Sequence, residues 1–198
     1  MKKLVFALVF VIASTTVFSQ FNAKIIEKKL YKMSENLYVS KCYVSNKQYA
    51  DFISYLEEKG EKSKLKYCLL DTAQWGEPMS TLYHAHPVYF ECPVVTMSYE
   101  GAVEYCKWLT EKYNSTTKKK FTNVEFRLPT KEELENYTKQ YDKANETWSG
   151  KIPADKQGYY MISEITTGKN IVGENNAHKK VDKCPSAMVG FRVVAAIK

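Results

Sequence analysis

Long apolar runs are missing from this 198-residue chain, and the longest, Leu4–Ala13, has about ten residues, half of what crosses a bilayer. A transmembrane segment is therefore not expected. The run follows two lysines and precedes small residues at Val17 and Ser19, which is the pattern of a secretory signal peptide. We expect residues 1–19 to be that signal and residues 20–198 to form one domain. The protein is then exported by a bacterium, to the periplasm or to the medium.

Arginine is nearly absent, since only Arg127 and Arg192 stand against 27 lysines. A guanidinium makes bidentate, geometry-demanding contacts that an ammonium does not, so we expect both arginines to make such contacts inside the fold. The lysines are dispersed apart from short runs at 118–120 and 179–180, and loss of the two signal lysines lowers the net charge from +7 to +5. Nucleic-acid binders cluster their basic residues, so we expect no nucleic-acid partner.

Cysteine is scarce and odd in number. An exported chain enters an oxidising compartment in which disulfides form. Because five thiols cannot all pair within one chain, at least one is free or bonds outside it, and the pairing pattern stays open. The cysteines are Cys42, Cys68, Cys92, Cys106 and Cys184.

Three helix starts can be recognised from their capping residues. Ser45 with Gln48, and Thr130 with Glu133, have the spacing of a capping box, and Ser98 is placed to cap another helix. Apolar residues recur at helical spacing after each start. The three stripes are Tyr49, Phe52, Ile53 and Leu56, then Ala102, Cys106, Leu109 and Tyr113, then Leu134, Tyr137 and Tyr141.

Strands are predicted between these helices. Alternating or continuous apolar residues favour strands at 36–44, 93–97, 124–128 and 189–197, the last of them buried on both faces. Residues 67–91 contain a glycine and two prolines that interrupt regular elements, so we expect an irregular segment there. The whole pattern predicts an α+β fold, with two or three helices packed on short mixed or antiparallel sheets.

Four stretches occur in a characteristic order: VSKCYVSNKQY at 39–49, HPV at 86–88 leading into SYEGAVEYCKWL at 98–109, RLPTKEE at 127–133, and GFR at 190–192. Together they resemble the formylglycine-generating enzyme, or sulfatase-modifying factor, family, whose domains have a variant of the C-type lectin fold. The likeness covers residues 35–198 and implies structural roles for the residues that carry it. These residues are His86, Ser98, Cys106, Trp108, Arg127, Thr130, Glu133, Gly190 and Arg192.

The departures from the family concern its chemistry. Its enzymes place an R-G-G-S segment and a C-x-x-x-x-C pair before the G-F-R strand, and the two thiols bind copper and activate oxygen. Between Glu164 and Gly190 this chain has only Cys184 and no R-G-G-S. One thiol cannot form a two-sulfur site or cycle through the same disulfide. We therefore expect a pseudoenzyme with no catalytic residues and no cofactor.

Two other groups of residues have a reactive and a structural interpretation. His84 and His86 form an H-x-H pair that Glu91 or Cys92 could complete as a metal site, but the family uses H-P-V as a structural lead-in, and we expect no metal. Cys106 lies on an apolar helix face, which favours a core thiol over a nucleophile. The resemblance implies a bridge from Cys106 to a cysteine after G-F-R, but Val193 stands there, so the bridge is lost unless Cys184 substitutes.

The resulting functional hypothesis is a binding module for a protein or glycan of the cell envelope, acting through loops at 67–91 and 142–175. Aromatic side chains supply rigid contact area, although they serve equally well as core. The candidate ligand-binding residues are Trp75, Tyr83, Trp148, Tyr159 and Tyr160. Two alternatives stay open. One is a reduced copper-dependent thiol oxidase that uses Cys184 with Cys92 or Cys106, and the other is a structural subunit of an envelope assembly.

Overall fold

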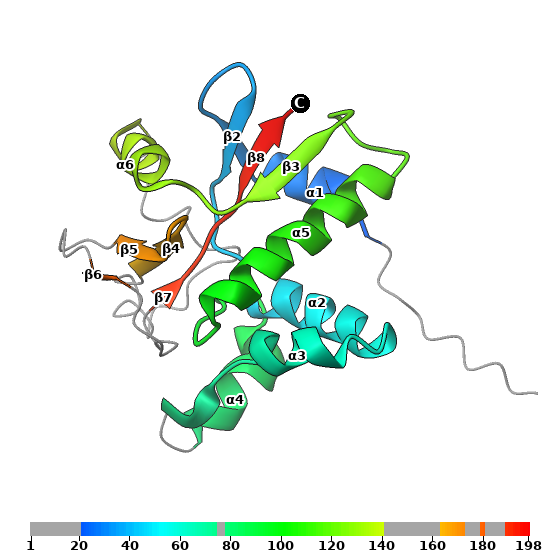
Figure 1. Cartoon of the computed structure of the whole chain (residues 1–198), viewed down its shortest axis with the longest axis vertical. Coiled ribbons are helices and arrows are strands. Elements are labelled where there is room, and N and C mark those ends of the chain that lie inside the picture. The colour runs from blue at the N-terminus through cyan, green and yellow to red at the C-terminus, as the bar shows by residue number, and fades with distance from the viewer. Residues whose placement is uncertain (1–20, 75–77, 141–162, 173–178, 181–188) are drawn as a thin grey trace, which may run out of the picture.

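The computed structural model describes residues 21–74, 78–140, 163–172, 179–180 and 189–198 (Figure 1). Helices and two small sheets make up this part of the chain, which confirms the predicted α+β class. None of the described helices is long and apolar enough to cross a membrane. The predicted signal and several singled-out residues lie outside the described residues: 1–19, Trp75, Tyr141, Trp148, Tyr159, Tyr160 and Cys184.

Helices predominate in the described residues up to Ser115. The elements of this part are α1 (Ala23–Lys28), β1 (Leu30–Lys32), β2 (Leu37–Ser40), α2 (Asn46–Glu58), α3 (Lys62–Cys68), η1 (Thr72–Gln74), α4 (Met79–Ala85), η2 (Pro87–Tyr89) and α5 (Tyr99–Ser115). The second half adds β3 (Val124–Arg127), α6 (Lys131–Gln140), β4 (Ser163–Thr166), β5 (Asn170–Val172), β6 (Lys179–Lys180), β7 (Val189–Gly190) and β8 (Val194–Ile197). The three predicted helices are thus α2, α5 and α6.

The first sheet has the order β1-β2-β8-β3, and all of its pairs are antiparallel. The last strand, β8, lies between two strands from earlier in the chain, so Val194 is in register with both Val39 and Arg127. On one face of this sheet Leu134 and Tyr137 of α6 pack on Val39 and Val194, and α5 covers the opposite face (Figure 1). The predicted burial on both faces is therefore confirmed for Val194 and Ala195, whereas Ala196 and Ile197 are partly exposed.

The second sheet has the order β6-β5-β4-β7. Strand β4 pairs antiparallel with β5 and parallel with β7, which places Glu164 opposite Gly190. The single strand predicted at 189–197 is therefore wrong, because β7 belongs to the second sheet and β8 to the first. The intervening residues 191–193 cross from one sheet to the other.

The predicted helix starts are confirmed by the capping hydrogen bonds of their first turns. Ser45 Oγ accepts from the Gln48 amide at 3.3 Å, and Gln48 Oε1 accepts from the Ser45 amide at 3.0 Å. Ser98 Oγ accepts from the amide of residue 101 at 2.8 Å. Thr130 and Glu133 cap each other in the same reciprocal way, at 3.1 and 2.8 Å. These bonds satisfy first-turn amides that have no partner within the helix.

The strand predicted at 93–97 is wrong. Only an isolated bridge joins Ser45 to Pro93, although Val94 and Met97 are buried as the apolar pattern requires. The physical reason is Thr96, whose φ of 63° lies in the left-handed region and cannot continue an extended strand. The apolar residues of segment 93–97 therefore indicate that the segment is buried, and not that it pairs in a sheet.

The irregular segment predicted at 67–91 is also wrong, because it contains α4 and two short 3-10 helices. Pro78 is the N-cap residue of α4, and Pro87 is the first residue of η2. Proline lacks an amide hydrogen that these positions do not need, so here it begins helices. Tyr83 consequently lies on a packed helix, and its buried hydroxyl donates to the Pro93 carbonyl at 2.8 Å.

Candidate functional site

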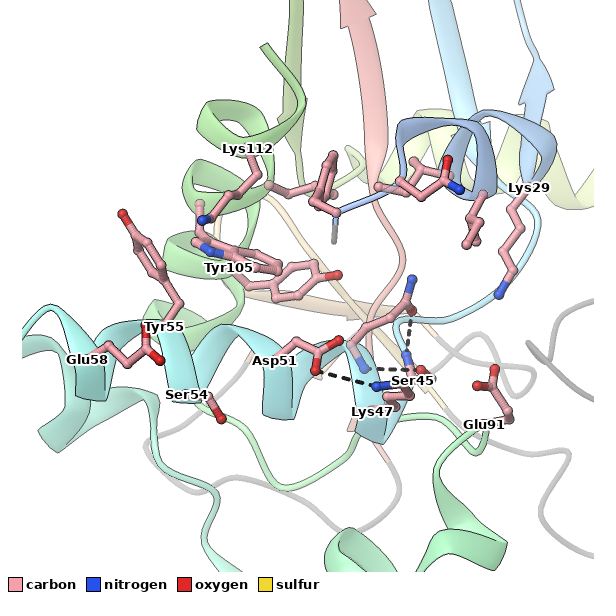
Figure 2. Close-up of a pocket in the computed structure, with 17 residues that line it drawn as sticks. Lys29, Ser45, Lys47, Asp51, Ser54, Tyr55, Glu58, Glu91, Tyr105 and Lys112 are labelled. Carbon is pink, nitrogen blue, oxygen red and sulfur yellow. Dashed lines mark hydrogen bonds and ion pairs between the residues drawn. The ribbon is translucent and has the colours of Figure 1, made fainter. Parts of the chain in front are cut away.

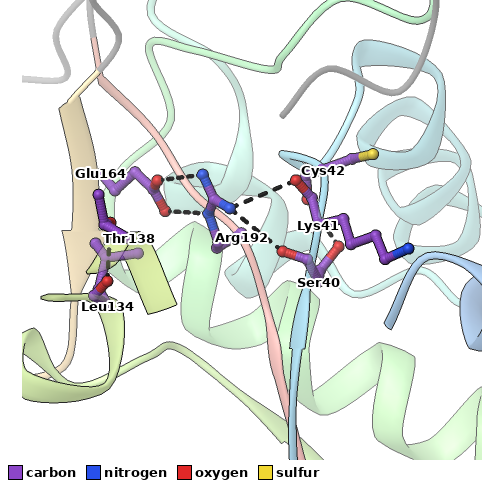
Figure 3. A network of polar contacts seen from close by, with 7 residues as sticks. All are labelled: Ser40, Lys41, Cys42, Leu134, Thr138, Glu164 and Arg192. Atoms are coloured by element: carbon purple, nitrogen blue, oxygen red, sulfur yellow. Dashed lines mark hydrogen bonds and ion pairs between the residues drawn. The ribbon is translucent and has the colours of Figure 1, made fainter. Parts of the chain in front are cut away.

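Arg192 and Glu164 form a buried ion pair where the chain crosses between the sheets (Figure 3). Arg192 Nε and Nη2 donate to the two carboxylate oxygens at 2.7 and 2.6 Å, and only 3% and 7% of the two side chains are exposed. Nη1 reaches the carbonyls of Ser40 and Lys41 at 3.4 and 3.5 Å. The expected bidentate contact is present, and it links the second sheet to β2.

Two tyrosine rings enclose the Arg192 guanidinium. Its carbon lies 4.9 Å from the ring centre of Tyr43 and 4.8 Å from that of Tyr137. Burial by itself would lower the pKa of Arg192. The interactions of the guanidinium with its partners, the Glu164 charge first among them, outweigh this effect, so the pKa lies above its ordinary value. Burial also raises the pKa of Tyr137 to about 12. The buried ion pair and the two rings that enclose it therefore have a structural role.

Arg127 makes the second bidentate contact. Its Nη1 and Nη2 donate to the Glu133 carboxylate at 2.8 and 2.6 Å, and the same carboxylate caps α6. Partial burial raises the pKa of Glu133, yet hydrogen bonds from Arg127 and the Thr130 amide hold it below its usual range. The pair therefore fixes the end of β3 against the start of α6.

The two histidines of the H-x-H pair point to different environments. His86 is exposed, whereas His84 Nδ1 lies 2.9 Å from Asn46 Oδ1 and Nε2 lies 3.3 Å from Thr96 Oγ1. The Asn46 amide donates to the Tyr83 carbonyl, so its oxygen faces His84, which assigns the hydrogen to Nδ1. Both ring nitrogens of His84 are thus engaged by protein groups. Among the described residues no three His, Cys, Asp or Glu side chains are grouped for a metal.

The cysteines do not fit the copper site that the family resemblance implies. That site needs two thiolates, and the chain has only Cys184 in the corresponding stretch of sequence. Among the described residues Cys92 and Cys106 are buried. Burial raises the pKa of the Cys106 thiol above its ordinary value, and it raises that of Cys68 to about 12. Both thiols are therefore protonated core groups at neutral pH.

A groove of about 740 Å³ lies between α1, α2 and α5 (Figure 2). We call it the α1–α2–α5 groove. From α1 and its caps it is lined by Asn22, Ile25, Ile26 and Lys29, from α5 by Tyr105, Trp108, Leu109 and Lys112, and from α2 by Lys47, Gln48, Asp51, Ser54, Tyr55 and Glu58. The remaining lining residues are Phe21, Ser45 and Glu91. Its volume is in the range of ligand sites in proteins.

An unsatisfied donor marks the wall that α5 contributes. Trp108 is only 9% exposed, and its indole Nε1 is buried without a hydrogen-bond partner in the described part of the chain. Such a buried donor costs about 1–3 kcal/mol unless an acceptor reaches it. The buried Tyr105 ring lies 5.3 Å from that of Trp108, and Figure 2 shows its hydroxyl pointing into the groove. Burial raises the pKa of Tyr105, which keeps this hydroxyl a neutral donor.

The charges around the groove balance. Three lysines and three carboxylates line it: Lys29, Lys47, Lys112, Asp51, Glu58 and Glu91. Lys47 Nζ lies 3.5 Å from Asp51 Oδ1, and Lys112 Nζ lies 4.4 Å from the centre of the Tyr55 ring. The groove therefore favours a ligand without net charge.

Among the described residues that the sequence analysis singled out, Trp108 lines this groove together with Ser45, Gln48, Glu91 and Leu109, none of which was a ligand-binding candidate. Ser98, Arg127, Thr130 and Glu133 serve helix starts, while Gly190 and Arg192 lie at the junction of the sheets. The contribution of α1 was missed by sequence reasoning. Its signal is short: Asn22, which caps the helix by accepting from the Lys24 amide at 3.1 Å, followed by two isoleucines.

Comparison with known proteins agrees with the architecture. A family model described as the Sulfatase-modifying factor enzyme 1-like domain matches residues 18–163, which is more than half of the chain. No curated protein and no solved structure matches the chain.

Proposed function

The chain belongs to the family of sulfatase-modifying factor enzyme 1-like domains, and we propose that it is an exported, non-catalytic member that binds a protein or a glycan of the cell envelope. The observation that carries this proposal is the α1–α2–α5 groove, whose volume of about 740 Å³ is in the range of ligand sites in proteins. The signal-peptide pattern of residues 1–19 supports the export part of the proposal.

The thiols support the non-catalytic part of the proposal. A reduced oxidase would pair Cys184 with Cys92 or Cys106, and reactive thiols need partly exposed, electropositive surroundings. Cys92 and Cys106 are instead buried, and the pKa of Cys106 is raised by burial. The oxidase alternative is disfavoured on these grounds.

Binding is tested by titrating the purified protein against arrays of immobilised glycans and peptides. We expect saturable binding by at least one class, lost in Ile25→Glu and retained in Leu69→Glu. Ile25 lines the groove and is 53% exposed, and Leu69 is 55% exposed outside it. Because the two substitutions place the same charge on equally exposed apolar positions, Leu69→Glu is a matched control for folding and solubility.

Two results contradict the proposal. One is the absence of saturable binding to either class by the wild-type protein. The other is oxygen consumption, above a protein-free control, when the protein is supplied with copper and a cysteine-containing peptide.

A further inference from the structure

We infer that Thr110 and Asn114 of α5 act together as a substitute strand, which closes the β3 edge of the first sheet and keeps a second copy of this chain from pairing there. This inference goes beyond the proposed binding function and does not depend on it.

Strand β3 lies at an edge of the first sheet, because no further strand follows it in the described part of the chain. Alternate residues of an antiparallel strand face its partner. The Asn123 carbonyl accepts from the Lys198 amide at 3.0 Å, so Val124 and Phe126 face away from β8. Such an edge offers amides and carbonyls to another chain. Because both outward-facing residues are buried, these groups need partners.

Two side chains of α5 supply those partners. The Asn114 amide nitrogen donates to the Val124 carbonyl at 2.7 Å, and its oxygen accepts from the Val124 amide at 3.1 Å. Thr110 Oγ1 accepts from the Phe126 amide at 2.8 Å. The hydrogen of this hydroxyl has two acceptors within reach, the Cys106 carbonyl at 2.9 Å and the Phe126 carbonyl at 3.3 Å. The outward-facing groups of β3 thus meet side-chain atoms where a neighbouring strand would place its backbone.

The spacing of the two residues matches the strand. Helix α5 packs along β3 (Figure 1). Four residues of an α-helix advance by about 6 Å, and two residues of a strand advance by about 6.8 Å. Residues 110 and 114 therefore meet 126 and 124, so helix and strand run antiparallel. An asparagine amide both donates and accepts, as a peptide group does.

A second copy of this chain is the partner that fits an open β3 edge. If two β3 strands paired antiparallel about Phe126, Glu125 of each copy would lie opposite Arg127 of the other, and opposite charges across strands attract. The other edge of the sheet, β1, is protected differently, because it has three residues and ends on the exposed Lys32. Short strands and lysines deter strand addition, so both described edges of this sheet are guarded.

The first test is the molar mass of the full-length protein, measured by light scattering over a concentration series. Wild type should keep the mass of one chain, whereas Thr110→Ala/Asn114→Ala should form dimers as the concentration rises. The matched control Asn136→Ala/Thr138→Ala changes the same residue types on α6, where Thr138 donates to the Leu134 carbonyl of its own helix. It should stay a monomer. Alanine favours a helix at all four positions, so weaker helix formation does not explain a difference.

Hydrogen exchange followed by NMR locates the effect on the strand. In wild type the Val124 and Phe126 amides should be protected, although they face away from β8. Asn114→Ala should speed exchange of the Val124 amide about tenfold, and Thr110→Ala that of the Phe126 amide, because each loses one hydrogen bond. The other two amides of β3 face β8 and serve as the internal reference. Thr110→Ser keeps the hydroxyl and should leave exchange unchanged.

Three results overturn the inference. Unprotected Val124 and Phe126 amides in wild type would show that the side chains do not close the edge. A folded double variant that stays monomeric throughout the series would show that this edge needs no guard. Equal association of the α6 control would place the contact elsewhere. If thermal unfolding shows that the double variant is not folded, the single variants Thr110→Ala and Asn114→Ala carry the mass measurement.

Discussion

Arg192 is the residue at which the two sheets meet, and its energetics depend on its complete set of partners. A buried guanidinium pays a large desolvation cost that only a well-aligned carboxylate and further acceptors offset. Glu164 supplies the carboxylate, and the Ser40 and Lys41 carbonyls supply the acceptors. The pair is thus better described as a requirement for joining the sheets than as a gain in stability.

Arg192→Met is expected to lower the free energy of unfolding by about 3–5 kcal/mol, because it leaves the Glu164 carboxylate buried without its counter-charge. The matched change Arg127→Met breaks a pair that is partly exposed and should cost only about 1 kcal/mol. Urea unfolding of both variants measures the difference. Equal losses would show that the burial of Arg192 does not decide its energetic role.

A second prediction at the residue scale concerns His84. Burial lowers its pKa to about 4, below the ordinary value of 6.5. Between these values the unfolded chain binds a proton that the folded chain does not. The contribution to stability is therefore complete above pH 6.5 and is lost as the pH falls toward 4. We expect a loss of about 2 kcal/mol, after discounting for partial exposure.

The measurement is urea unfolding at several pH values for wild type, His84→Gln and His86→Gln. Carboxylates with lowered pKa values, such as Glu133, contribute a similar acid loss in all three proteins. The slope between pH 6.5 and 4 should flatten only in His84→Gln, because His86 is exposed. The same slope in His84→Gln and wild type would refute the assignment.

Much of this residue chemistry was visible in the sequence. The scarcity of arginine predicts bidentate contacts for Arg127 and Arg192, and the structure has both. The partner of Arg127, Glu133, is also predictable, because both residues belong to the same short motif and are only six positions apart in the sequence. Glu164 is not, since the contact depends on a parallel pairing between β4 and β7 that local patterns do not encode.

At the scale of elements, the approach of α5 to α2 depends on Gly101. A methyl group built there would lie 2.6 Å from Tyr49 Oη and 3.3 Å from Cys68 Cα. The Tyr49 hydroxyl cannot move away freely, because it is buried and donates to the Cys68 carbonyl at 2.8 Å. The glycine is required by a close approach of neighbouring elements and not by its own backbone conformation.

Gly101→Ala is therefore expected to destabilise the protein by about 1–3 kcal/mol, although the same change in a helix usually stabilises by about 0.5–1 kcal/mol. Tyr49→Phe removes the atom with which the methyl group collides. In the Tyr49→Phe background Gly101→Ala should cost at least about 1 kcal/mol less, and a double-mutant cycle of thermal unfolding measures this coupling. Additive effects would show that Tyr49 is not the obstacle.

Elements with local signals are the predictable ones. Helices α2, α5 and α6 begin at Ser45, Ser98 and Thr130 because short-range hydrogen bonds define each start. The segment 93–97 was predicted as a strand because burial without pairing has the same apolar pattern as a strand. Its position is set by contacts with α4 and with the residue that caps α2, because the Pro93 carbonyl accepts from Tyr83 and Pro93 forms an isolated bridge with Ser45.

At the scale of the whole molecule, the groove could not be predicted. Its walls come from three helices separated in sequence, and the predicted ligand-binding residues lie elsewhere or outside the described chain. Trp108 is recognisable from its motif, yet its place in the wall of the groove becomes apparent only when the neighbouring helices are in position. Sequence motifs thus predicted the family scaffold, and tertiary packing created the candidate site.

The last prediction concerns Cys68 and Cys106, two thiols that the folded chain buries. Cys68 and Cys106 are buried with raised pKa values, so they should not react with Ellman's reagent in the native protein and should react at once in denaturing urea. With copper and a cysteine peptide supplied, oxygen uptake should equal that of a Cys106→Ala control, since no catalytic step passes through that thiol. Rapid native labelling of Cys106, together with oxygen uptake that falls in Cys106→Ala, would instead identify a working oxidase.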